Sequence, residues 1–252
     1  MADTRTALPP SPGSIADDAD FDGDGFPDVA LGTGRMTRGE PLDDIDDGIV
    51  IVVYGSADGL TAKRTQAWSE TDFGGAASER FGWALAFGDF DGDSYSDLAI
   101  GNGDAAVGSA KEHAGTVRVM YGSPTGLTAH RSQLWSQNTP GVAGHTESHD
   151  GFGSALVAAN FGYGPHDDLA IGVHGENHDA GAVNILYGSP AGLAVDHNQI
   201  WDQASPGVPG SPERDDAFGV ALVAGQFRQS SYADLAIGIY LERVDTIAGA
   251  GA

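Results

Sequence analysis

The chain has 252 residues, and its 36 acidic and 12 basic side chains give a formal net charge of −24. This charge disfavours nucleic acid and anionic membrane surfaces, whose binding depends on Lys and Arg, and it favours divalent cations. The chain contains no cysteine, which excludes disulfides, zinc-thiolate sites and thiol catalysis. Abundant glycine (38 residues) together with periodic apolar runs indicates a loop-rich β protein and argues against a disordered chain.

The N-terminal stretch from Met1 to Ile15 has no apolar segment of the kind found in signal peptides. No run in the chain approaches the length of a membrane span, so we expect no membrane insertion. We expect residues 1–13 to be disordered and residues 14–252 to form the folded region.

Two nine-residue stretches, 20–28 and 89–97, carry aspartate at positions 1, 3, 5 and 9 and glycine at position 4. Two like charges about 4 Å apart cost roughly 1 kcal/mol in water and about 4 kcal/mol at an effective dielectric of 20. A compact loop of this kind therefore needs a cation at its centre. Oxygen ligands alone suit a hard ion, and calcium accepts six to eight of them. The eight carboxylates are Asp20, Asp22, Asp24 and Asp28, then Asp89, Asp91, Asp93 and Asp97.

Two other interpretations of these stretches are possible. The aspartates could belong to solvated acidic turns that hold no ion. An EF-hand is a second alternative, but position 12 is Leu31 or Ile100 where an EF-hand has Glu, and a strand-like run follows where a helix is required.

Four sequence markers recur with a period of about 67 residues, so internal repetition decides the architecture. The first is Tyr-Gly-Ser, the second a tryptophan, the third Phe-Gly and the fourth an Asp-Leu-Ala-Ile-Gly run with its variant Asp-Val-Ala-Leu-Gly. In the same order, the markers begin at Tyr54, Tyr121 and Tyr187; at Trp68, Trp135 and Trp201; at Phe81, Phe152 and Phe218; and at Asp28, Asp97, Asp168 and Asp234.

Each period predicts four short strands and almost no helix, because no segment shows a sustained apolar period of 3.6 residues. In chain order the third strands are expected at 49–54, 116–121 and 182–187. The fourth strand is short and ends at the tryptophan, as at 133–135. In the third unit the first two strands are expected at 152–158 and 169–172. Four strands in such a unit make a propeller blade, whose faces must be covered by neighbouring blades. The expected units are 14–80, 81–151, 152–217 and a partial 218–252.

These motifs resemble the FG-GAP repeat of integrin α-subunit β-propellers and their bacterial secreted relatives, over a stretch from about Ile15 to Gly238. In that family the loop between the first and second strands of a blade binds calcium through positions 1, 3, 5 and 9 and the backbone carbonyl at position 7. The resemblance therefore implies two calcium sites. The implied ligands are Asp20, Asp22, Asp24, Phe26 and Asp28, then Asp89, Asp91, Asp93, Tyr95 and Asp97.

The chain departs from the family pattern in its number of units and in its later loops. Such propellers usually close with about seven blades, whereas fewer than four full units are present here. We therefore expect an incomplete propeller: a fragment of a longer chain, an open arc, or a ring completed by a second chain. The loops of the third and fourth units keep one carboxylate each, and Arg228 is expected to pair with Asp234 in place of an ion. The aligned residues are Asn160, Gly162, Gly164 and Asp168, then Gln226, Arg228, Ser230 and Asp234.

No Gly-x-Ser-x-Gly, His-Glu-x-x-His or phosphate-binding glycine loop is present, so no enzyme activity is expected. The resemblance implies an extracellular or cell-surface module for adhesion or ligand binding, in which calcium is structural. A protein or glycan ligand would bind the face opposite the calcium loops, formed by the more variable loops. A glycan-binding lectin and an accessory domain of a secreted hydrolase are the alternatives. The variable loops are 32–48, 69–80, 101–115, 136–151, 172–181 and 202–217.

Aromatic residues and histidines leave further alternatives open. The three repeated tryptophans are expected in the core between blades, although tryptophan also forms stacking platforms for sugars. His145 and His149, with His174 and His178, could form a transition-metal site on the face opposite the Asp loops. Solvated histidines in polar loops are the alternative to that site.

Overall fold

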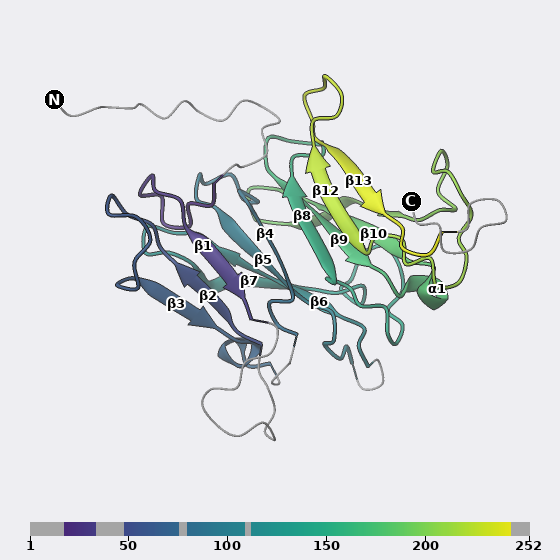
Figure 1. The fold of residues 1–252 in the computed structure, drawn as a ribbon, viewed down its shortest axis with the longest axis horizontal. Helices are drawn as coiled ribbons and strands as arrows, with labels where there is room; N and C mark the ends of the chain where they lie inside the picture. The colour runs from purple at the N-terminus through teal and green to yellow at the C-terminus, as the bar shows by residue number, and fades with distance from the viewer. Residues whose placement is uncertain (1–17, 34–47, 76–79, 109–111, 243–252) are drawn as a thin grey trace.

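The computed structural model describes residues 18–33, 48–75, 80–108 and 112–242. They form four antiparallel sheets, and the fold is all-β, an incomplete propeller of blades, as the sequence predicts (Figure 1). The segment 1–13, expected to be disordered, lies outside the described residues. The second and third units each form a complete four-stranded sheet, while three strands of the first unit and two of the fourth lie within the described ranges.

The sheets follow one another along the chain, and the strands within each are ordered as in the sequence. The first sheet contains β1 (Val29–Gly32), β2 (Val50–Val53) and β3 (Thr65–Trp68). The second contains β4 (Ala84–Gly88), β5 (Asp97–Asn102), β6 (Thr116–Tyr121) and β7 (Thr128–Trp135). The third contains β8 (Ala155–Ala159), β9 (Asp168–Val173), β10 (Ala182–Tyr187) and β11 (Ala194–Trp201). The last contains β12 (Ala221–Gly225) and β13 (Asp234–Gly238).

The prediction of almost no helix is confirmed. The described residues contain one 3₁₀ turn, η1 (Glu70–Phe73), and one four-residue helical turn, α1 (Glu176–Asp179). No helix in these ranges has the length and apolar character that a membrane crossing requires. The fourth strands are longer than predicted, since β7 begins at Thr128 rather than near Gln133.

The core lies between neighbouring sheets, because each sheet buries its apolar face against the next one. Strands β6 and β10 are buried along their whole length, as middle strands covered on both faces should be. Phe90 and Phe152 are completely buried between the second and third sheets. Burying a side chain of this size stabilises the fold by roughly 1.5–3 kcal/mol. Trp68, Trp135 and Trp201 join these clusters, as expected of core residues.

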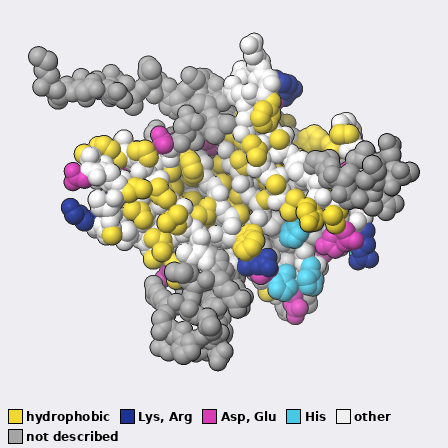
Figure 2. All heavy atoms as spheres, in the orientation of Figure 1, with side chains coloured by type: hydrophobic (Ala, Val, Ile, Leu, Met, Phe, Trp, Pro, Cys, Tyr) yellow, Lys and Arg dark blue, Asp and Glu magenta, His cyan; other side chains and the backbone are white. Residues whose placement is uncertain are grey.

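The first strands of successive units, β4, β8 and β12, lie side by side, and β1 lies next to β4 (Figure 1). Hydrophobic side chains gather over the face that these strands form (Figure 2). The close approach depends on glycine. A Cβ atom on Gly101 would lie 2.1 Å from the Gly153 carbonyl oxygen, and one on Gly172 would lie 2.3 Å from that of Gly219. The glycine of the Asp-Leu-Ala-Ile-Gly run therefore contacts the Phe-Gly glycine of the next unit.

Candidate metal centre

The two aspartate loops hold equivalent places in the first and second sheets. Loop 20–28 ends directly before β1, and loop 89–97 joins β4 to β5. In each loop the carboxylates at positions 1, 3 and 9 converge, so that one oxygen from each lies within 4.8 Å of the others. Within the described residues, these are the two groups of three or more potential metal ligands that meet this distance. They are Asp20, Asp22 and Asp28, then Asp89, Asp91 and Asp97.

The aspartate at position 9 anchors each loop to its own sheet. The carboxylate of Asp97 accepts hydrogen bonds from the backbone N–H of Phe90 at 2.8 Å and of Gly122 at 3.0 Å. Phe90 is at position 2 of the loop, and Gly122 follows β6, so the Asp97 side chain ties the loop to the third strand of its unit. Asp28 does the same in the first unit, through Phe21 at 2.7 Å and Gly55 at 2.8 Å.

The aspartate at position 1 closes the turn. Asp89 accepts the N–H of Gly92 at 2.7 Å, of Asp93 at 3.1 Å and of Ser94 at 3.0 Å. These three donors come from positions 4 to 6, where the chain must reverse direction. Ser94 has a φ of 74°, in the left-handed region that favours glycine.

Position 5 lies outside both carboxylate triplets. Asp24 and Asp93 are exposed and each accepts a hydrogen bond from the backbone N–H of position 7, Phe26 at 2.9 Å and Tyr95 at 3.0 Å. Of the ten predicted ligands, the structure thus gathers six carboxylates into two triplets. The other four residues lie in the same turns.

Burial of like charges raises the pKa of these carboxyl groups. Asp97 is fully buried, and loss of hydration, followed by the neighbouring charges of Asp91 and Asp89, raises its pKa to about 8 against two stabilising backbone N–H donors. Burial also raises the pKa of Asp22, Asp28 and Asp89. In each group the repulsion would be relieved by a cation between the carboxylates.

Two arginines, which the sequence analysis did not identify, reach the carboxylates at position 3. Arg131 donates to Asp91 at 3.1 Å, and Arg64 donates to Asp22. Each arginine comes from the outer part of the unit that carries its aspartate. Each also lies over the ring of the repeated tyrosine of that unit, Arg64 over Tyr54 and Arg131 over Tyr121. Their spacing of 67 residues was the available signal, because it equals the repeat period.

The carboxylate oxygens of the triplets that accept no hydrogen bond suit a hard divalent cation. Asp91 is 8 % exposed, and its second oxygen, Oδ1, is buried without a hydrogen-bond partner. A buried carboxylate oxygen in this state costs free energy unless something positive faces it. Since the ligand set contains only oxygen, calcium fits it better than zinc or copper.

The third and fourth loops retain the position-9 anchor but lack the triplet. Asp168 accepts the N–H of Phe161 at 2.7 Å and of Gly188 at 3.0 Å, as its counterparts do. In the fourth unit, Arg228 donates its Nε to Asp234 at 2.9 Å, and a second guanidinium nitrogen donates to the same oxygen. The expected pairing of Arg228 with Asp234 is therefore confirmed.

The alternative of a transition-metal site at His145, His149, His174 and His178 is not supported by the geometry. The His113 and His149 rings lie 5.2 Å apart, and His174 Nδ1 is 3.0 Å from the Ser154 hydroxyl. Across the described ranges, the histidines do not bring three potential ligand atoms within 4.8 Å. With Arg80, Asp104 and others, they line a surface cavity of about 350 Å³ instead.

Comparison with known proteins agrees with the repeat pattern. The FG-GAP repeat family matches residues 81–120, which include the whole second aspartate loop. The chain is an FG-GAP repeat protein. It is 31 % identical over 235 residues, 88 % of its length, to a protein named integrin alpha-PS2 from Drosophila melanogaster. It is also 36 % identical over 84 residues, 33 % of its length, to integrin alpha-6 from Homo sapiens.

A further relative is named as an enzyme. The FG-GAP protein is 29 % identical over 117 residues, 45 % of its length, to phosphatidylinositol-glycan-specific phospholipase D from Bos taurus. The chain spans only a small part of these relatives: 14 % of integrin alpha-PS2, 6 % of integrin alpha-6 and 14 % of the phospholipase.

Proposed function

We propose that this chain is a non-enzymatic, calcium-stabilised propeller module that binds a ligand outside the cell. The observation that carries the calcium assignment is the convergence of three carboxylates in each of the first two loops. The similarity to proteins named as integrin α subunits supports the extracellular setting and ligand binding.

In this proposal calcium has a structural role. The convergent carboxylates are the first ligands, from Asp20, Asp22 and Asp28 in one loop and from Asp89, Asp91 and Asp97 in the other. Asp24, Asp93 and the carbonyls of Phe26 and Tyr95 complete the two sets. An ion that binds only the folded chain adds about 2.7 kcal/mol of stability at a concentration one hundred times its Kd.

Calorimetric titration with calcium tests the assignment. We expect two calcium ions per chain for the unmodified protein and one for either Asp22→Asn or Asp91→Asn. The double variant should bind none. Chelation should lower the melting temperature of the unmodified protein, and added calcium should restore it.

Asp58→Asn is the matched control, because Asp58 is an exposed aspartate outside both loops. It should leave two ions bound. Two ions retained by the double variant, or a melting curve indifferent to chelator and calcium, would rule out these sites.

The ligand surface is proposed on the side opposite the aspartate loops. Its support is the cavity of about 350 Å³ between the second and third units, where Trp83 is 57 % exposed and lies beside Arg80. A protein ligand agrees with the integrin-like relatives. An exposed tryptophan beside polar groups also favours the second candidate, a glycan.

Parallel arrays of glycans and of extracellular proteins separate these two candidates. Trp83→Ala should weaken binding of whichever class is captured, and Leu134→Ala, at an exposed apolar residue on an outer strand, should leave it unchanged. Binding that is insensitive to Trp83→Ala would move the ligand to another surface. The resemblance to a phospholipase also supports the remaining alternative, a module that accompanies a hydrolase domain, which enzyme assays on a longer gene product would test.

A further inference from the structure

Successive units are joined by one repeated contact between a Gly-Leu step and a Tyr-Gln pair. At the first junction Leu127 donates its N–H to the Tyr54 hydroxyl at 2.8 Å, and Gln66 donates its Nε2 to the Leu127 carbonyl at 3.0 Å. The Tyr54 hydroxyl is in turn hydrogen-bonded to Gln66. The Leu127 side chain is thereby buried, with 2 % exposed.

The second junction repeats this arrangement. Leu193 donates its N–H to the Tyr121 hydroxyl at 3.2 Å, and Gln133 donates to the Leu193 carbonyl at 3.0 Å. The glycine before each leucine is required by the tyrosine, because a Cβ on Gly192 would lie 1.8 Å from the Tyr121 hydroxyl oxygen. We call the acceptor residues the Tyr-Gln site and the inserted residues the Gly-Leu step.

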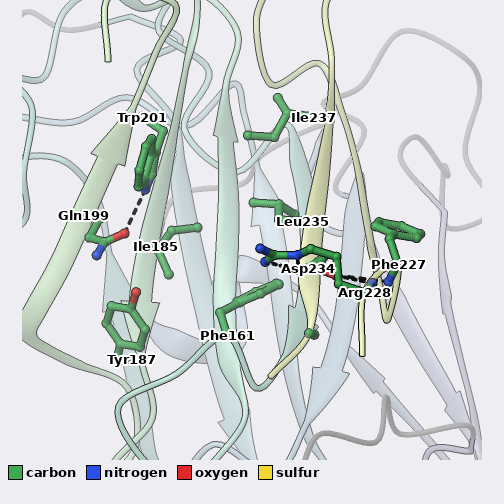
Figure 3. A pocket seen from close by; sticks show the side chains of 11 residues that line it. Phe161, Ile185, Tyr187, Gln199, Trp201, Phe227, Arg228, Asp234, Leu235 and Ile237 are labelled. Atoms are coloured by element: carbon green, nitrogen blue, oxygen red, sulfur yellow. Dashed lines mark hydrogen bonds and ion pairs between the residues drawn. The ribbon is translucent and has the colours of Figure 1, made fainter. Parts of the chain in front are cut away.

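The third Tyr-Gln site, formed by Tyr187 and Gln199, is open. Figure 3 shows both side chains with Trp201 on one wall of a cavity, and Leu235 and Ile237 of β13 on the other. The cavity has a volume of about 550 Å³. Among the described residues, none donates a backbone N–H to the Tyr187 hydroxyl. Gln199 already accepts the Trp201 indole N–H at 2.8 Å, as Gln133 does from Trp135 at 3.2 Å.

The first Gly-Leu step, Gly59-Leu60, is unused. Leu60 is 54 % exposed, while the two equivalent leucines are each 2 % exposed. A Cβ built on Gly59 meets no atom within 4 Å, in contrast to Gly126, where it would lie 2.2 Å from the Tyr54 hydroxyl oxygen. The described part of the chain thus carries an empty Tyr-Gln site in its third unit and, in its first unit, a Gly-Leu step that is inserted into no such site.

Strand β13 also has no third strand beside it within the described ranges. In the first three units one oxygen of the position-9 aspartate accepts the N–H of the glycine after the third strand; these contacts join Asp28 to Gly55, Asp97 to Gly122 and Asp168 to Gly188. In the fourth unit Arg228 holds that oxygen of Asp234. The outer edge of β13 pairs with no strand in the described ranges.

We propose that Gly59-Leu60 of a second copy of this chain inserts into the open site at Tyr187 and Gln199, so that copies associate head to tail. The joint blade takes its first strand from β12 and its third and fourth from β2 and β3 of the second copy. Its second strand is β13 or the equivalent β1, which carry the matching runs Asp-Leu-Ala-Ile-Gly and Asp-Val-Ala-Leu-Gly. One of these two short strands gives way to the other. Such an interface uses different surfaces on the two partners.

Light scattering during gel filtration, with calcium present and over a range of loading concentrations, tests the association. The unmodified chain of 25.8 kDa should show a mass that rises with concentration towards at least twice that value. Leu60→Asp and the double variant Tyr187→Phe/Gln199→Ala should each weaken association by about 30-fold or more, as loss of a buried interface anchor does. Leu134→Asp, at a leucine that is also exposed but lies in neither element, should associate normally.

A mixing experiment separates this head-to-tail contact from other self-association. Leu60→Asp keeps an intact Tyr-Gln site, and the double variant keeps an intact Gly-Leu step. Each alone should stay a monomer, while an equimolar mixture should form a one-to-one dimer.

The proposal is wrong if the unmodified chain stays monomeric up to about 1 mM, the upper range of weak association. It is also wrong if the two variants associate as the unmodified chain does, which would place another segment of the chain or another surface in the contact. Melting temperatures of the variants in calcium verify that they are folded. Calcium stoichiometry is measured separately, so failure of this contact leaves the calcium proposal standing.

Discussion

The aspartate loops of the first two units and the corresponding loops of the last two share one anchoring contact but differ strongly in charge. In all four, the position-9 aspartate accepts the N–H of the phenylalanine at position 2. These contacts join Asp28 to Phe21, Asp97 to Phe90, Asp168 to Phe161 and Asp234 to Phe227. This anchoring contact is therefore common to all four units, whereas the carboxylates at positions 1 and 3 belong to the first two loops alone.

The later loops show how the turn is held without those carboxylates. Asn160 donates its side-chain amide to the Gly164 carbonyl at 2.9 Å, and Arg228 pairs with Asp234. Tyr163 occupies position 4 with a φ of 62°, close to the 76° of Gly92 in the second loop. The anchor is common to all four loops, but the turn differs: positions 4 and 6 have positive φ in the first two loops, whereas position 6 of the third loop is Pro165 and no residue of 226–234 has a positive φ. In our proposal the additional carboxylates of the first two loops, which repel one another, are explained by the cation that they bind.

The largest expected effect comes from removing the shared anchor with and without calcium. Asp97→Ala and Asp168→Ala each leave two or three buried N–H donors unpaired, so each should lower the free energy of unfolding by about 3–5 kcal/mol in chelator. In calcium the loss for Asp97→Ala should grow, because that variant cannot bind its ion. The loss for Asp168→Ala should stay the same. Urea unfolding of both variants measures the difference.

Equal calcium dependence in the two variants would contradict the division between the loops. Asp58→Asn controls for general effects of removing a negative charge from this acidic chain.

A second contrast between the two halves lies at the interfaces between units. Glu70 pairs with Arg118 at 2.6 Å, whereas Glu176, at the next interface, accepts from the neutral Gln137 at 2.6 Å. Burial, with the negative charges of Asp150 and its neighbours, raises the pKa of Glu176 to about 7. The folded chain therefore holds this proton between about pH 4.5 and 7, where the unfolded chain has lost it.

The stabilisation of the folded chain by protonated Glu176 is fully present below about pH 4.5. It declines as pH rises to about 7, by up to about 3 kcal/mol in the free energy of unfolding. Glu176→Gln should flatten this part of the profile and make the protein more stable than the unmodified chain at pH 8. Denaturant unfolding at several pH values measures it. If the difference between the two proteins does not change with pH, Glu176 is ionised in the folded chain throughout.

The two aspartate loops themselves differ at position 6, where Gly25 has a φ of 83° and Ser94 a φ of 74°. Serine is strained in this region, so Ser94→Gly should raise the free energy of unfolding by about 0.5–1 kcal/mol, while Gly25→Ser should lower it by a similar amount. Thermal unfolding in calcium compares the reciprocal variants. A loss of stability in Ser94→Gly would show that the serine side chain contributes more than the strain costs.

The strands were largely predictable from the sequence, because apolar alternation and a repeat period are local signals. The third strand of the third unit was expected at 182–187, which are the bounds of β10. The fourth strands were placed too short. Residues 128–132 are mostly polar and lie on a sheet edge, and a register shift between Val119 and Tyr121 separates them from the regular pairing. Solvent-facing edge strands carry little apolar pattern to detect.

The carboxylates of the candidate site were predictable because their charge density within nine residues has few explanations. Their partners were not. Arg131 contacts Asp91 across 40 residues, and Gln133 contacts Leu193 across 60. Such contacts depend on how strands stack, which a single sequence shows only through its repeat period. The open Tyr-Gln site could be seen only after the two occupied copies had been compared in space.

The smallest expected effect concerns Arg228, whose side chain is 79 % exposed and supplies a positive charge where we propose a cation in the earlier loops. The Arg228 guanidinium holds the pKa of Asp234 below its usual range. Exposed ion pairs contribute little and are screened by salt, so Arg228→Ala should lower the melting temperature slightly, and less at high salt. Faster amide exchange at Phe227 would locate the loss in the turn. Arg214→Ala, at a comparably exposed arginine near Asp215, should change neither. If Arg228→Ala and Arg214→Ala behave alike, the fourth turn depends on the Asp234 backbone contacts alone.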